Sequence, residues 1–116
     1  RMVSTASPAK LSIWPEEILK LPKVEIPISG VTGHILKNSE KQIVFFHFME
    51  GTTVPDHNHS AQYGYLVTGE MTLEIEGRTE FHIAGDKYYI PAGVKHRTSF
   101  SKDSFVIDMS SNHDRY

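Results

Sequence analysis

Residues 51–69 read Gly51-Thr-Thr-Val-Pro-Asp-His57-Asn-His59-Ser-Ala-Gln62-Tyr-Gly-Tyr-Leu-Val-Thr-Gly69, and they contain two histidines one residue apart. Side chains in a strand repeat every two residues, so we expect His57 and His59 on one side of a sheet. Gln62 follows at short range and offers an amide oxygen. Because neutral imidazole is the commonest protein ligand for transition metals, this segment predicts part of a metal site.

A second segment carries one more candidate ligand. It reads Gly85-Asp-Lys-Tyr-Tyr-Ile-Pro91-Ala-Gly93-Val-Lys-His96 and places His96 after a Pro-x-Gly turn. Three imidazoles that converge on one point make a metal site, so we expect His96 to meet His57 and His59. The alternative is an empty barrel whose histidines are hydrogen-bonded polar residues on the inward face.

The composition limits the class of protein. The chain has 116 residues, a net charge of −2 and no cysteine, so we expect a single domain without disulfides. No cluster of lysine or arginine exceeds two residues, which argues against a nucleic-acid partner. No apolar run approaches membrane-spanning length and no signal peptide is recognisable, so a cytoplasmic protein without membrane contact is expected.

Short strands separated by turn residues are expected from residue 31 onward, in the pattern of an all-β sandwich or barrel. The expected strands are Val31–Lys37, Gln42–Glu50, Tyr63–Thr68, Met71–Glu76, Thr79–Ile83, Lys87–Pro91, His96–Phe100 and Ser104–Ser110. Both faces of Gln42–Glu50 are apolar, so this strand is expected to be covered twice. A second subunit is the simplest outer cover, and we therefore expect a homodimer.

The N-terminal part is expected to differ from the rest. Residues 1–10 are small and polar, typical of a loose arm. Trp14–Leu19 predicts one helical turn, and prolines confine Lys20–Pro27 to an edge strand or an extended connection. We therefore divide one domain into an arm and edge strand over residues 1–30 and a barrel over residues 31–116.

The two histidine segments resemble the two motifs of the cupin superfamily. The matching patterns are Gly51-x5-His57-x-His59-x2-Gln62-x6-Gly69 and Gly85-x5-Pro91-x-Gly93-x2-His96. The resemblance implies a double-stranded β-helix, the jelly-roll barrel. Gln62 stands one residue early and in place of the usual glutamate, and Phe100 stands where the second motif usually ends in asparagine.

The predicted cofactor is one divalent transition metal, namely Zn, Ni, Fe, Cu or Mn, held by His57, His59, His96 and Gln62. If Gln62 lies out of reach, a three-histidine site remains. With Gln62 as an amide ligand, every protein ligand is neutral and the ion keeps its full charge. Such a site suits an anionic oxygen ligand.

Candidate pocket residues follow from strand parity. Gly64 and Leu66 share the face of Gln62, while Thr98 and Phe100 share the face of His96. Gly64 either opens space for a substrate or relieves crowding against a neighbouring strand, and the sequence favours neither.

Asp108 lies in the apolar run Ser104–Ser110, where an unpaired charge would be expensive to bury. It is a candidate general acid or base near the metal. The alternative is a structural aspartate, for example one paired with Arg97 or Arg115.

A narrower resemblance concerns function. Residues 62–70 and Asp108 are similar to small cupins that open the ring of unsaturated uronates from pectin and alginate breakdown. That resemblance implies a metal-dependent enzyme on a sugar acid or another small oxygenated metabolite, with isomerase-type or ring-opening chemistry. The alternatives are a metal-dependent dioxygenase and a non-catalytic module that binds or senses a small ligand.

Overall fold

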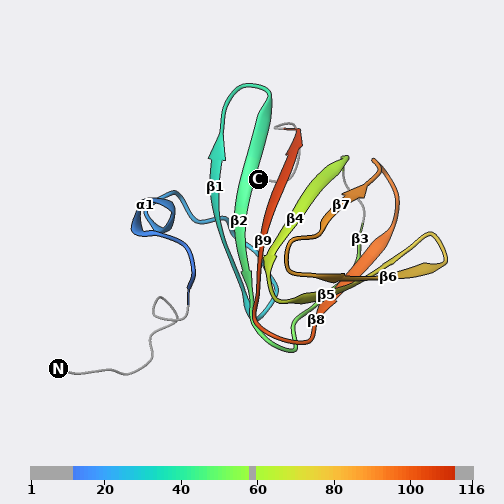
Figure 1. Ribbon diagram of the computed structural model, residues 1–116. Helices are drawn as coiled ribbons and strands as arrows, with labels where there is room; N and C mark the ends of the chain where they lie inside the picture. The colour runs from blue at the N-terminus through green and yellow to red at the C-terminus, as the bar shows by residue number, and fades with distance from the viewer. Residues whose placement is uncertain (1–11, 58–59, 112–116) are drawn as a thin grey trace.

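A computed structural model describes residues 12–57 and 60–111, which form two antiparallel β-sheets (Figure 1). One sheet has the strand order β1-β2-β9-β4-β7 and the other the order β3-β8-β5-β6. The first sheet contains β1 (Val31–Lys37), β2 (Lys41–Phe48), β9 (Ser104–Ser111), β4 (Gln62–Thr68) and β7 (Lys87–Ile90). The second contains β3 (Thr53–His57), β8 (His96–Phe100), β5 (Glu70–Ile75) and β6 (Arg78–Ile83). This arrangement confirms the predicted all-β jelly roll.

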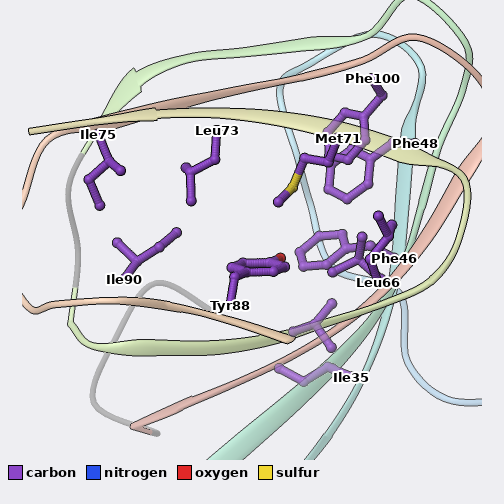
Figure 2. Packing of buried hydrophobic residues seen from close by; sticks show 12 residues of the cluster. Ile35, Phe46, Phe48, Leu66, Met71, Leu73, Ile75, Tyr88, Ile90 and Phe100 are labelled. Atoms are coloured by element: carbon purple, nitrogen blue, oxygen red, sulfur yellow. The ribbon is translucent and has the colours of Figure 1, made fainter. Parts of the chain in front are cut away.

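The core lies between the two sheets. Met71, Leu73 and Ile75 alternate along β5 with more exposed residues, and all three are buried. Figure 2 shows them pointing toward Tyr88 and Ile90 of β7, which belongs to the other sheet. Burial of each such side chain contributes about 1.5–3 kcal/mol, so this alternation fixes which face of β5 turns inward.

The segment before β1 is bound to the barrel rather than loose. After the single turn of α1 (Glu16–Leu19), the chain runs along the edge of β1. The backbone N–H of Val24 donates to the carbonyl of Gly33 over 3.0 Å, and the N–H of Ile35 donates to the carbonyl of Pro22 over 2.9 Å. We call residues 22–28 the strap. The predicted arm over residues 1–10 lies outside the described residues, and within the described ranges no helical segment has the length and hydropathy of a membrane span.

The outer face of β2 is partly covered by the same chain. The indole of Trp14 contacts the ring of Phe45 edge-on, with centroids 5.4 Å apart, and the ring of Phe105 in β9 at 5.6 Å. Edge-on aromatic pairs of this kind stabilise a packed cluster. The apolar outer face of β2 therefore does not by itself require a second subunit, and the homodimer remains a prediction.

Candidate metal centre and ligand cavity

A cavity of about 380 Å³ opens between the two sheets, within the size range of small-molecule sites. Five predicted site residues line it, and they come from both sheets. These are Gln62, His96, Thr98, Phe100 and Asp108. The remaining walls come from the strap, β1, β2, β3, β5 and β7. They comprise Glu25, Ile26, Pro27, Ile28, Val31, Phe46, Phe48, Val54, Pro55, Met71, Tyr88 and Ile90.

The two histidine segments meet in the second sheet. The backbone of His57 in β3 pairs directly with His96 in β8, after a register shift between Val54 and His57. Residues far apart in the sequence are therefore neighbours across one strand pair. The side chain of His57 and the whole of His59 lie outside the described residues, so their part in the predicted metal site stays a prediction.

His96 has the tautomer that suits a metal ligand. Its side chain is 2% exposed, and its Nδ1 lies 3.0 Å from the carbonyl oxygen of Val94. Because a carbonyl only accepts, Nδ1 carries the proton and donates it to Val94. In the neutral ring, Nε2 then carries the lone pair that a metal would bind.

Gln62 is oriented by Asp108. A carboxylate only accepts, so the amide turns its Nε2 toward Asp108 and donates a hydrogen bond to Oδ2. The other amide atom, Oε1, is buried and has no hydrogen-bond partner among the described residues. A buried amide oxygen without a partner is costly, and a cation would satisfy it.

Tyr88 is the second partner of Asp108. Its hydroxyl donates to Oδ1 over 2.9 Å, inside the cavity. Burial raises the pKa of the Tyr88 phenol well above its ordinary value of 10.0, and the charge of Asp108 and its hydrogen bond raise it further. The phenol therefore stays protonated at neutral pH and remains a donor to Asp108.

Gly64 makes room for this contact. In the sheet it pairs with Tyr88 on one side and with Asp108 on the other. A Cβ built on Gly64 would overlap the Tyr88 ring, which lies across the glycine to reach the carboxylate. Of the two predicted roles of Gly64, the structure therefore supports relief of crowding against a neighbouring strand. The space beside Gln62 is filled by Tyr88, and Leu66 is fully buried in the core.

The other histidines whose side chains the structure describes lie away from the cavity, as does Arg97. Nδ1 of His34 donates a hydrogen bond to the carbonyl oxygen of Leu21 over 3.0 Å, His47 contacts Asp103, and His82 contacts the carboxylates of Glu80 and Asp86. None of the three histidines lines the cavity. Arg97, a predicted partner of Asp108, is exposed on β8, and Arg115 lies outside the described residues.

Two parts of the cavity were not predicted. The sequence indicates that one of Tyr88 and Tyr89 points inward, but it does not show that Tyr88 contacts Asp108. The strap reads as an extended connection, and only its isoleucines, spaced two residues apart at Ile26 and Ile28, could have suggested a wall. Both contacts depend on how the two sheets pack against each other, and a local sequence pattern does not show this packing.

The donor set of the described residues fits a divalent metal. His96 offers a lone pair on Nε2, and Gln62 offers an amide oxygen that has no partner within residues 12–57 and 60–111. Among the side chains that the structure describes, no three histidine, cysteine, aspartate or glutamate residues gather into a metal-binding group. Two of the predicted ligands, His57 and His59, fall outside that set of side chains.

Comparison with known proteins agrees with the fold. A family model for the cupin domain matches residues 44–108, more than half of the chain. No functionally curated relative matches the sequence. An RmlC-like cupin from Shewanella frigidimarina is 26% identical, with a TM-score of 0.72 over 80% of this chain and 85% of that protein.

Two further solved structures have the same fold. KdgF from a Halomonas species is 25% identical, with a TM-score of 0.72 over 86% of this chain and 94% of that protein. The polyketide cyclase RemF from Streptomyces resistomycificus is 17% identical, with a TM-score of 0.71 over 86% and 80%, a similarity that concerns the fold alone. Both histidine segments contribute residues to one cavity, and the family model covers the chain from β2 into β9. The chain therefore belongs to the cupin family.

Proposed function

We propose that this chain is a metal-dependent enzyme that moves a proton on a small oxygenated metabolite, with Asp108 as the acid–base group. The supporting observation is the position of Asp108, whose buried carboxylate lines the same cavity as His96 and Gln62. Buried carboxylates with specific partners in a cleft are typical of catalytic sites.

The proposed metal ligands are His57, His59, Gln62 and His96. When bound, a divalent metal would polarise a substrate oxygen and so acidify the neighbouring C–H or O–H group. The hydrogen bond from Gln62 Nε2 to Asp108 links the metal side of the cavity to the acid–base group. Gln62 thus has two roles, since its Oε1 would face the ion while its Nε2 positions the carboxylate.

Asp108 is held at both carboxylate oxygens. Oδ2 accepts a hydrogen bond from Gln62 and Oδ1 accepts one from Tyr88, which fixes the orientation of the carboxylate in the cavity. Asp108 takes a proton from one atom of the substrate and returns it to another, so the net reaction is an isomerisation without an added oxidant or reductant. Tyr88 stays protonated and holds Oδ1 in place during both steps.

The test is hydrogen exchange in heavy water. The metal-loaded protein is incubated anaerobically in D2O with a panel of small hydroxy and keto acids, some with sugar-like chains and some with hydrocarbon chains. Proton NMR then follows the loss of individual C–H signals. We expect exchange or isomerisation of at least one acid, and we expect Asp108→Asn to abolish it because an amide accepts no proton at neutral pH.

The matched control is Asp86→Asn. Asp86 accepts a hydrogen bond from the N–H of Ile83 and contacts His82, and it does not line the cavity. This variant is expected to keep full exchange activity. Turnover that occurs only when the incubation is repeated in air would replace the proposal by a dioxygenase, and ligand binding without exchange on any acid would replace it by a binding or sensor module.

A further inference from the structure

We propose that the ligand of this cavity is a small acid or enol whose remaining part is hydrocarbon, rather than a densely hydroxylated sugar acid. This inference rests on the proposed function for the polar end of the cavity, where the oxygen head group would lie beside His96, Gln62 and Asp108. It adds the chemical class of the rest of the molecule.

The walls of the cavity are mostly apolar and come from several elements. Phe46 and Phe48 of β2, Met71 of β5 and Phe100 of β8 all line it and are nearly fully buried. Figure 2 shows the side chains of Met71, Phe48 and Phe100 gathered beside one another. A hydrocarbon ring or chain placed against them gains burial without losing hydrogen bonds.

Three side-chain donors at the inner end of the cavity are already engaged within the protein. The hydroxyl of Tyr88 and Nε2 of Gln62 both donate to Asp108, and Nδ1 of His96 pairs with the carbonyl of Val94. Several ring hydroxyls of a sugar acid would lose their water in this cavity and find few replacement partners. Burying hydroxyl groups without hydrogen bonds is unfavourable, so the cavity discriminates against such a molecule.

The charged residues that line the cavity support the same inference. Among the described residues that line the cavity there is no lysine or arginine, and the ionisable side chains besides His96 and Tyr88 are Glu25 and Asp108. Glu25 lines the cavity and is exposed, so it lies where the cavity opens to solvent. A carboxylate on the ligand would be repelled at that opening and favoured at the inner end, beside the proposed cation.

The strap wall of the cavity is held in place by hydrogen bonds to β1. Ile26 and Ile28 line the cavity, and the strap that carries them is tied to β1 through Val24 and Gly33. A preformed wall costs little conformational entropy on binding. Ile28 lines the cavity without belonging to the packed core cluster, so it can be changed with little effect on the fold.

The experiment compares two acids with the same head group. Cyclohexanecarboxylate and galacturonate each carry a carboxylate on a six-membered ring, and only the second ring is hydroxylated. Binding to the metal-loaded protein is measured by NMR titration. We expect cyclohexanecarboxylate to bind about tenfold or more tightly, because the head groups contribute equally and the walls favour hydrocarbon.

Ile28→Ser is expected to weaken cyclohexanecarboxylate binding by about fivefold, because it removes apolar wall area. Ile83→Ser, at a 63% exposed isoleucine on β6 outside the cavity, is the matched control and should leave both affinities unchanged. Equal or tighter binding of galacturonate, or no binding of either acid, would overturn the inference. Preferential binding of cyclohexanecarboxylate without hydrogen exchange on any acid would sink the enzyme proposal alone and leave this inference standing.

Discussion

Tyr88 of β7 donates a hydrogen bond of 2.9 Å to Asp108 of β9 although a whole strand, β4, lies between them. The bond is possible because the residue of β4 that pairs with both Tyr88 and Asp108 is Gly64, which has no side chain to block the ring. Asp108, Tyr88 and Gly64 therefore form one packed unit, and a substitution of any one of them should affect the positions of the other two.

Gly64→Ala is expected to destabilise the protein by about 1–3 kcal/mol, because the new methyl group would overlap the Tyr88 ring. The gain from a stiffer unfolded chain, about 0.4–1 kcal/mol, is too small to offset this. Urea unfolding measures the difference. The double variant Gly64→Ala/Tyr88→Leu should recover part of the loss, and strictly additive effects would show that the ring does not lie over the glycine.

Tyr88→Phe keeps the ring and removes the donor to Oδ1 of Asp108. A buried carboxylate oxygen that loses its donor should cost about 1–3 kcal/mol of unfolding free energy near neutral pH. The pH dependence follows from the raised pKa of the Tyr88 phenol. In the unfolded chain the phenol ionises near its ordinary value of 10.0, while in the folded protein it stays protonated, so its contribution is complete below that pH and is lost as the pH rises toward the folded pKa.

The measurement is urea unfolding between about pH 8 and pH 11, bracketing the ordinary tyrosine pKa, on both proteins. The wild type should lose stability more steeply than Tyr88→Phe at the alkaline end. Identical alkaline slopes would show that Tyr88 titrates alike in the folded and unfolded states.

Gln62→Leu tests the amide oxygen as a metal ligand. Since Oε1 of Gln62 is buried without a partner among the described residues, its loss should lower zinc affinity by about tenfold or more. Competition with a chelator and elemental analysis measure the affinity and the metal content. Gln42→Leu is the matched control, because Oε1 of Gln42 is likewise buried without a partner among the described residues, but Gln42 does not line the cavity. Equal loss of zinc in both variants, or in neither, would remove Gln62 from the ligand set.

The predicted homodimer can be tested on the outer face of the first sheet. Tyr63 and Tyr89 lie side by side there, with centroids 5.0 Å apart, and are 52% and 49% exposed. If a second subunit covers this face, Tyr63→Ser/Tyr89→Ser should halve the mass measured by light scattering. Phe81→Ser, at a 77% exposed position on β6, should leave the mass unchanged. A wild-type protein of monomer mass would contradict the homodimer.

Local patterns were sufficient for most of the fold. The alternation of Met71, Leu73 and Ile75 predicts β5 and its inward face, because burial repeats with the period of the strand. β3 was missing from the expected strands, since Thr53–His57 contains Pro55 and polar residues and its register shifts before His57. Proline and irregular pairing both weaken the signal of a strand.

The sequence predicts several residues of the candidate site, but it predicts few of the contacts between them. The burial of His96 and of Asp108 follows from motif position and from the apolar run around them. The contact between Tyr88 and Asp108 depends on two strands that pair with the same neighbour, and no spacing in the sequence encodes that order. Likewise, Trp14 covers Phe45, and the sequence separation between these two residues does not indicate that they are in contact.

Trp14 is the single tryptophan of the chain. Because it packs on Phe45 and Phe105 just before the strap begins, its fluorescence reports the docking of the N-terminal segment and not the closure of the inner core. The same segment continues into Ile26 and Ile28. During refolding, the emission of one native fluorophore should therefore follow the docking of the segment that supplies the strap wall of the cavity.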